Sequence, residues 1–161
     1  MTATAKPRPR KRAELALTVQ NASRSRRLPA RARLARWMRA ALERTAVVTL
    51  RFVGPAEGRA LNARYRRRDY ATNVLTFAYE EARPLAGDIV ICPGVVAREA
   101  RAAGKPLEAH YAHLVVHGTL HLQGYDHRRA RDAAVMERRE TAILRRLGYP
   151  DPYREPARTA A

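Results

Sequence analysis

Residues 112–122 are almost wholly apolar, and histidines interrupt them at a regular spacing. The only polar side chains in this stretch are His113, His117, Thr119 and His121. Each residue of a helix advances by about 100°, so His117 and His121 lie about 40° apart on one helical face. The pattern therefore predicts an apolar helix from which imidazole rings emerge on one side.

Gly124 comes just after this helix, and His127 follows three residues later. Glycine takes a positive φ without steric cost, so a sharp turn at Gly124 can bring His127 back toward His117 and His121. Three neutral imidazoles that converge in this way are typical of a catalytic zinc site with an open fourth position. An apolar setting disfavours charged imidazole, and a metal ligand must be neutral. The alternative is a set of hydrogen-bonded core histidines.

We expect His117, His121 and His127 to bind one Zn²⁺ per chain, although nitrogen ligands also accept nickel and copper. His113 precedes His117 by four residues, which makes it a candidate to orient a metal ligand. His110 is interpreted as a packing or surface residue.

The spacing of the three histidines also occurs in metzincin peptidases, which need a glutamate directly after the first histidine as general base. Here that position is Gly118. Without this carboxylate a peptidase lacks the group that activates water, so peptide hydrolysis is not the leading interpretation. Asp126 is the nearest carboxylate and is interpreted as a turn residue. Cys92 is interpreted as a buried apolar residue at a strand end.

The formal net charge of +17 comes almost entirely from arginine, since only three of the 32 basic residues are lysines. Residues 1–44 hold thirteen basic and two acidic residues. Such a charge predicts attraction to a polyanion, above all nucleic acid. A bias of the source proteome toward arginine and alanine is the alternative explanation of the excess.

The order of predicted elements indicates an α+β fold in one domain. Alternation and apolar runs predict strands over 14–20, 46–53, 73–79 and 87–92. Helical spacing, with proline and glycine at the ends, predicts helices over 29–44, 55–65, 95–103, about 106–123 and 129–147. We therefore expect a small mixed four-stranded sheet covered by about five helices.

The chain length of 161 residues favours a single domain, here expected over 13–153. Residues 1–12 have a basic composition without apolar periodicity and are expected to be a disordered arm. Residues 154–161 are expected to be a flexible tail. A single cysteine and the lack of a signal peptide or membrane-spanning run favour a cytoplasmic protein without a membrane partner.

The histidine segment, read as His117-Gly-Thr-Leu-His121-Leu-Gln-Gly124-Tyr-Asp-His127, strongly resembles the signature of the YbeY family of bacterial endoribonucleases and rRNA maturation factors. The resemblance covers about residues 14–153 and departs from the family at Thr76, where serine is usual, and at Ala78, where proline is common. It extends to Leu61-Asn62, Tyr65-Arg66-x-Arg68-Asp69, Thr72–Phe77, Gly87-Asp88-Ile89, Gly104-Lys105-Pro106 and Leu147-Gly148-Tyr149.

This resemblance implies a zinc-dependent, single-strand-specific endoribonuclease that acts in 16S rRNA maturation and ribosome quality control. The three motif histidines would be the zinc ligands. Arg66 would be the catalytic or phosphate-binding arginine, and Arg68 a further substrate-binding residue in the basic run. The implied partners are the 16S rRNA precursor and the small ribosomal subunit or its proteins.

The general base stays open at this point, between attack by the ribose 2′-hydroxyl and attack by metal-activated water. Two other classes of function also stay open. One is a non-catalytic ribosome-assembly factor with a structural zinc, and the other is a metallopeptidase-like hydrolase that lacks the usual glutamate.

Overall fold

The computed structural model describes residues 12–66 and 72–154, with the side chain of Arg66 excepted. The predicted basic arm over 1–12 and the predicted tail over 154–161 therefore lie almost entirely outside the described residues, and both stay predictions.

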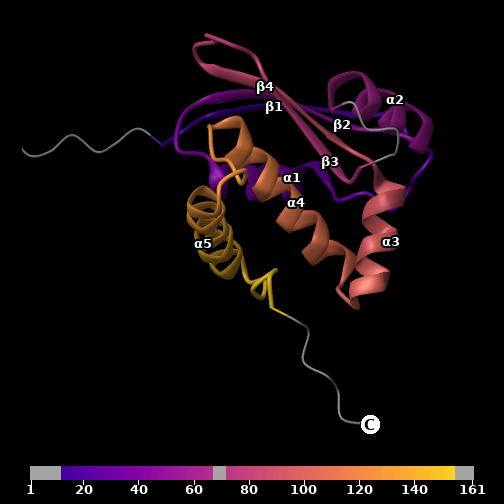
Figure 1. Ribbon diagram of the computed structural model, residues 1–161. Coiled ribbons are helices and arrows are strands. Elements are labelled where there is room, and N and C mark those ends of the chain that lie inside the picture. Colours follow the sequence, from indigo (N-terminus) through magenta and orange to yellow (C-terminus); the bar gives the residue numbers. More distant parts are fainter. Residues whose placement is uncertain (1–11, 67–71, 155–161) are drawn as a thin grey trace, which may run out of the picture.

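Strands and helices alternate in the first half of the described chain, and helices dominate the second half (Figure 1). The elements are β1 (Leu15–Asn21), α1 (Arg31–Ala41), β2 (Ala46–Phe52), α2 (Pro55–Arg66), β3 (Val74–Ala78), β4 (Leu85–Ile91), α3 (Pro93–Ala103), α4 (Leu107–Leu122) and α5 (Ala130–Leu147).

The strands form one mixed sheet in the order β1-β2-β4-β3. The first three of these are parallel, and β3 pairs antiparallel with β4 at the edge. Parallel neighbours need a crossover, which α1 supplies between β1 and β2. The predicted α+β fold, with its mixed four-stranded sheet and five helices, is confirmed.

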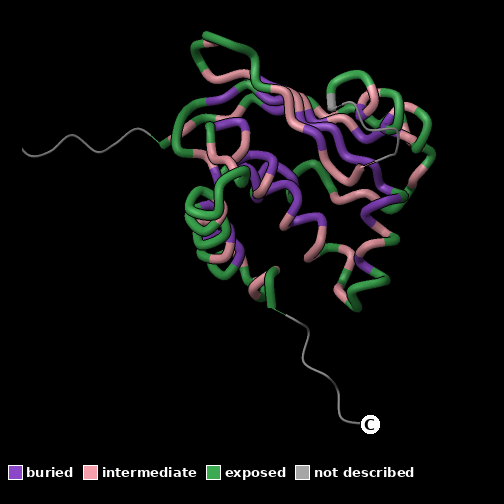
Figure 2. The backbone as a smooth tube through the Cα atoms, in the orientation of Figure 1, coloured by how far each residue is buried: buried purple, intermediate pink, exposed green. Residues whose placement is uncertain are grey.

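Helix α4 is the centre of the main core, and α1, α4 and α5 lie on the same side of the sheet (Figure 1). Nine of its sixteen residues are buried, and Figure 2 shows a much more exposed α5 beside it. The buried α4 residues Tyr111, Val115 and Leu120 belong to the same core cluster as Trp37 of α1 and Ile89 of β4. The apolar helix expected from residues 112–122 is therefore the element on which the sheet and helices α1, α3 and α5 pack.

A smaller cluster of buried residues lies in part on the other face of β3 and β4. It contains Leu75 and Val90, with Leu61 of α2 packed against it. Cys92, directly after β4, is 1% exposed and belongs to this cluster. The interpretation of Cys92 as a buried apolar residue at a strand end is confirmed.

The predicted boundaries of three elements were wrong by two or three residues. Helix α3 begins at Pro93 rather than Val95, since proline is tolerated in the first turn of a helix. The first helix spans Arg31–Ala41 rather than 29–44, because Leu42 takes an extended conformation (ψ 131°) and the backbone leaves the helix there. Strand β4 begins at Leu85 rather than Gly87, because Leu85 and Ala86 still pair with Ala46 and Val47 of β2. Among the described residues, no helix is both long and apolar enough to cross a membrane.

Candidate metal centre

Helix α4 and the turn after it bring three histidines to one place. His117 and His121 lie one turn apart on α4. The helix ends at Leu122 with Gln123 as its cap, and Gly124 then takes φ +100°, a conformation that side-chain-bearing residues rarely adopt. The backbone N–H groups of Gly124 and Tyr125 donate to the last carbonyls of α4. This turn reverses the chain, and His127 points back toward the helix, as the position of Gly124 predicted.

The ligand nitrogens of His117, His121 and His127 all lie within 4.8 Å of one another. Nε2 of His121 is 3.0 Å from Nδ1 of His127. A tetrahedral zinc ion with Zn–N bonds of about 2.0–2.1 Å places its nitrogen ligands roughly 3.3 Å apart. Two imidazole nitrogens at this separation need a proton or a metal ion between them, because their lone pairs otherwise repel. The donor set therefore fits a metal ion with three nitrogen ligands.

Solvent reaches this site from one side. The side chain of His117 is 22% exposed, and His127 lies on the surface. A site with three protein ligands and an open side is typical of catalytic zinc, whereas structural zinc is enclosed by four ligands.

Glu140 of α5 holds His117 from behind. Its Oε1 lies 2.7 Å from Nδ1 of His117, and its side chain is completely buried. A carboxylate only accepts hydrogen bonds, so Nδ1 of His117 carries the proton and donates it, and Nε2 keeps the lone pair that can bind a metal. The carboxylate thus determines which nitrogen of His117 is available.

Two further donors complete the environment of Glu140. Nε2 of His113 lies 2.7 Å from Oε2, and the hydroxyl of Tyr153 donates to the same oxygen. Burial alone raises the pKa of Glu140, but the hydrogen bonds from His113, His117 and Tyr153 outweigh it and lower the pKa to about 2. Glu140 is therefore an ionised carboxylate at neutral pH, although it lies in the core.

The ligand atoms of three of these side chains, His113, His117 and Glu140, also lie close enough together to hold a metal ion. Hydrogen bonds already account for their contacts, since both imidazoles donate to the carboxylate. The triad of His117, His121 and His127 is therefore the better candidate for a metal centre. His113, expected to orient a ligand, reaches His117 through Glu140.

The role of Glu140 was missed by the sequence analysis, although its helix contains a signal. Met136, Glu140, Ile143 and Leu144 are the buried residues of α5, and they recur at helical spacing. A glutamate on the apolar face of an arginine-rich helix needs a buried partner. Its distance of 23 residues from His117 along the chain hides which partner that is.

Gly118 faces the sheet rather than the metal centre. A Cβ atom at this position would lie 3.3 Å from the side chains of both Ile89 and Thr76. The glycine lets α4 pack closely on β3 and β4. A glutamate at position 118 would point into the sheet. It therefore could not act as the general base that peptidases have at this position.

The turn that carries His127 is anchored on the end of α1. The buried side chain of Gln123 accepts a hydrogen bond from the backbone of Glu43 at 2.7 Å and donates to Ala41 and Thr119. The hydroxyl of Tyr125 donates to Glu43 at 2.6 Å. These contacts fix the direction in which the chain leaves α4, and the sequence analysis did not anticipate them.

Asp126 makes local backbone contacts in the same turn. Its Oδ1 accepts hydrogen bonds from the backbone N–H groups of His127, at 2.7 Å, and of Arg128, at 3.3 Å. The interpretation of Asp126 as a turn residue is confirmed.

The two predicted arginines stay outside this geometry. Arg66 is the last residue of α2, and its side chain is not among the described ones. Arg68 lies outside the described residues. Their expected roles stay predictions.

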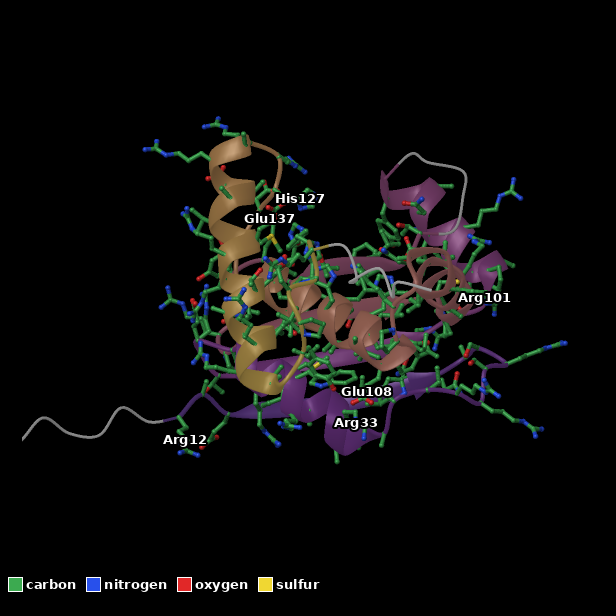
Figure 3. The ribbon with its side chains drawn as sticks, turned by 90° about the horizontal axis from the view of Figure 1, so that it is seen from below. Arg12, Arg33, Arg101, Glu108, His127 and Glu137 are labelled. Carbon is green, nitrogen blue, oxygen red and sulfur yellow. The ribbon has the colours of Figure 1, made fainter. Side chains whose placement is uncertain are left out.

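Positive charge is spread over several elements of the surface. Arg12 precedes β1, Arg33 lies in α1 and Arg101 in α3, and all three side chains point outward (Figure 3). Arg33 is paired with Glu108, at 3.4 Å. Exposed arginines on different sides of the molecule can contact a polyanion at more than one place.

Comparison with known proteins places this architecture in one family. The profile of the Endoribonuclease YbeY family matches residues 18–148. A protein from Aromatoleum aromaticum named Endoribonuclease YbeY is 58% identical over 142 residues, which are 86% of this chain and 92% of that protein. A protein of the same name from Thiobacillus denitrificans is 58% identical over 142 residues, covering 87% of this chain and 97% of its own length.

A solved structure supports the fold independently. The solution structure of a protein from Thermotoga maritima aligns with a TM-score of 0.53 and covers 89% of this chain and 99% of its own. Its sequence is 23% identical, so this likeness concerns the fold alone. Taken with the family profile and the close relatives, the architecture leads to one conclusion: the chain belongs to the Endoribonuclease YbeY family.

Proposed function

We propose that this protein is a zinc-dependent endoribonuclease that cuts single-stranded RNA, with His117, His121 and His127 as the metal ligands. The observation that carries the proposal is the convergence of these three imidazoles at a site open to solvent, with no peptidase glutamate beside it. Relatives that share more than half of their residues with this chain are named endoribonucleases.

Zinc at such a site supplies a Lewis acid for the hydrolysis of a phosphodiester. The protein supplies the arrangement of the ligands. Glu140 accepts a hydrogen bond from Nδ1–H of His117 and thereby leaves the lone pair of Nε2 for the metal ion. The turn at Gly124, held by Gln123 on the end of α1, keeps His127 within 3.0 Å of His121.

Arg66 is proposed to stabilise the negative charge that develops on the phosphate oxygens during cleavage. A guanidinium group matches two phosphate oxygens at once and stays charged at every relevant pH. Arg68 is proposed to contact the RNA backbone nearby. The high positive charge of the chain favours RNA binding that weakens as salt rises.

The proposed biological role is maturation of 16S rRNA and ribosome quality control, in the cytoplasm where ribosomes assemble. The proposed partners are the 16S precursor and the small ribosomal subunit or its proteins. Support comes from the family membership together with the formal charge of +17.

A cleavage assay with purified variants tests this function. We expect wild-type protein loaded with zinc to cut a single-stranded RNA, and His117→Ala and Arg66→Ala to lose about 100-fold or more of the rate. Arg101→Ala is the matched control, since it removes an exposed arginine from α3. Equal cleavage by wild type and His117→Ala would indicate a contaminating nuclease and overturn the proposal, and an inactive wild type that still binds metal would favour an assembly factor.

A further inference from the structure

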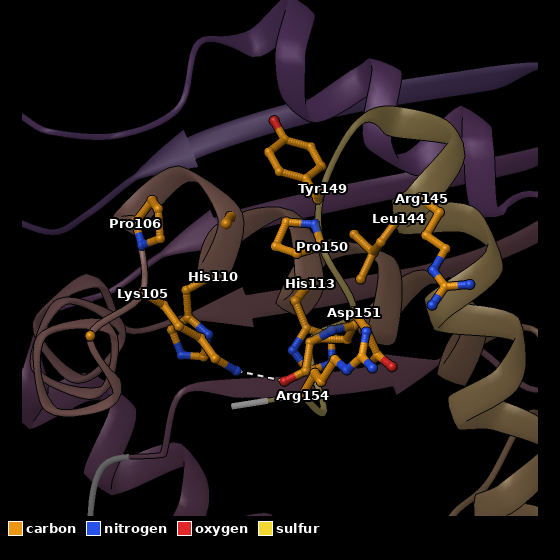
Figure 4. A pocket seen from close by; sticks show the side chains of 13 residues that line it. Lys105, Pro106, His110, His113, Leu144, Arg145, Tyr149, Pro150, Asp151 and Arg154 are labelled. Carbon is orange, nitrogen blue, oxygen red and sulfur yellow. Dashed lines mark hydrogen bonds between the residues drawn. The ribbon is translucent and has the colours of Figure 1, made fainter. Parts of the chain in front are cut away.

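A cavity of about 630 Å³ opens between α4, the end of α5 and the segment that follows α5. Figure 4 shows His110 and His113 on one side of it, with Leu144 and Arg145 of α5 on the other. This volume is in the range of sites that hold small molecules. None of the residues proposed above as metal ligands lines it.

The cavity is linked to the candidate metal centre through two side chains, His113 and Glu140. His113 lines the cavity and hydrogen-bonds Glu140, whose other oxygen accepts a hydrogen bond from His117. The rings of His113 and His117 are 6.2 Å apart, about one turn of α4. A polymer that is held at the metal centre therefore has its neighbouring unit within reach of the cavity.

The charged groups of the cavity favour an anion. Lys105, Arg145 and Arg154 line it, against the single carboxylate of Asp151. That carboxylate already accepts hydrogen bonds from the backbone of Tyr153, at 2.9 Å, and from the hydroxyl of Thr141. Within the described part of the chain, the guanidinium groups of Arg145 and Arg154 form no ion pair.

The remaining wall suits a planar heterocycle. Tyr149, three prolines and Leu144 contribute apolar surface beside the two imidazoles. Nε2 of His110 lies 3.2 Å from Glu99, and its buried Nδ1 has no hydrogen-bond partner among the described residues. The Glu99 carboxylate accepts a hydrogen bond from Nε2 and holds the imidazole in place, so the ring of His110 adds a flat surface on which a nucleobase can stack.

We propose that this cavity binds one nucleotide of single-stranded RNA, next to the nucleotide held at the metal centre. The base enters the apolar part beside His110, and a flanking phosphate meets Arg145 and Arg154. This subsite rests on the proposed function for its substrate, and it adds a second point at which the enzyme grips the strand.

Binding measurements without cleavage test the subsite. The probe is a fluorescently labelled single-stranded RNA of about ten nucleotides, in excess chelator so that metal-dependent cleavage does not interfere. The double variant Arg145→Ser/Arg154→Ser removes the two cations of the cavity. Arg138→Ser/Arg146→Ser is the control, because it removes two exposed arginines of α5 that do not line the cavity.

We expect the cavity variant to weaken RNA binding about tenfold more than the control variant. Equal weakening by both pairs would show that only net charge matters and would overturn the subsite. The same would follow if the wild-type protein did not bind this RNA at all.

A second variant tests entry into the cavity without a change of charge. Ala109 lines the cavity from α4, so Ala109→Trp fills it, and Ala102→Trp places the same side chain on the exposed end of α3. We expect Ala109→Trp alone to raise the Kd about tenfold while its melting temperature shows that it is folded. Wild-type affinity in this variant would contradict the proposal.

The outcome is separable from that of the nuclease proposal. Unchanged RNA affinity in the cavity variants with normal cleavage would overturn the subsite and leave the nuclease intact. If the wild-type protein binds RNA without cutting it, and the cavity variants bind more weakly, the nuclease proposal is overturned and the subsite stands.

Discussion

Oε1 of Glu140 lies 2.7 Å from Nδ1 of His117, and this contact joins the buried face of α5 to the candidate metal centre on α4. The carboxylate has no exposed surface and accepts two more hydrogen bonds on its other oxygen. The candidate metal centre is thus supported by a charged network inside the core.

The variant Glu140→Gln is expected to bind zinc about 10–100-fold more weakly than wild type. An amide can place its NH₂ group toward His117 and lacks the charge that increases the basicity of the ligand. Competition with a chromophoric chelator measures the affinity. Glu137→Gln is the control, since Glu137 lies on the same helix and is exposed. Equal zinc affinity in both variants would refute a role of Glu140 in holding His117.

Gly118→Glu introduces the residue that metzincin peptidases have at this position. The substitution is expected to destabilise the folded protein rather than create a peptidase. The new side chain would meet Ile89 and Thr76 and bury an unpaired charge against the sheet. We expect the free energy of unfolding to fall by about 3 kcal/mol or more.

Urea unfolding of Gly118→Glu is compared with that of Gly54→Glu. A Cβ atom at Gly54 meets no atom within 4 Å, so this control is expected to change the free energy of unfolding by less than about 0.5 kcal/mol. Wild-type stability in Gly118→Glu would show that α4 does not pack on the sheet as described.

Gln123→Ala is expected to destabilise the protein by about 2 kcal/mol, because it leaves the backbone groups of Glu43, Ala41 and Thr119 without their partner. The same unfolding assay measures this loss. Gln20→Ala is the control, since Gln20 is an exposed residue whose side chain accepts one bond from Arg51. If both glutamines contributed equally, the anchoring of the His127 turn on α1 would be wrong.

Stability is expected to decline at high pH through Tyr111. Burial, and then the neighbouring Cys92, raise the pKa of Tyr111 from 10.0 to about 12. Between these two pH values the unfolded chain loses the phenolic proton and the folded chain keeps it, so ionisation favours unfolding as pH rises. The free energy of unfolding of wild type should therefore fall more steeply over this window than that of Tyr111→Phe. Parallel pH profiles of the two proteins would contradict the burial of this hydroxyl.

The sequence predicted most of the fold because its signals are local. Proline and glycine mark the ends of α3, α4 and α5, and Gly104 and Gly148 take the positive φ that a helix end with glycine favours. The strand order β1-β2-β4-β3 was not predicted, since strand pairing depends on contacts between residues far apart in the chain. The early end of α1 depends likewise on Gln123, which binds the backbone of Glu43 from 80 residues away.

The candidate site was likewise predicted where its residues are close in sequence and missed where they are not. His117, His121 and His127 lie within eleven residues, so helical periodicity and one glycine were sufficient to bring them together. Glu140 and Tyr153 come from α5 and the segment after it, and helical spacing around His117 contains no information about them. A buried glutamate at core spacing in α5 was the available signal, and only the structure identifies its partners.

The central claim is that the three histidines hold a metal ion on which RNA cleavage depends. The most direct test removes the metal from wild-type protein with a chelator, measures the cleavage of single-stranded RNA, and then restores zinc in steps up to one equivalent. We expect cleavage to disappear with the metal and to return in proportion to zinc, with the full rate at one ion per chain, and we expect no recovery in His121→Ala. Undiminished cleavage by protein shown by elemental analysis to be free of metal would contradict the central claim.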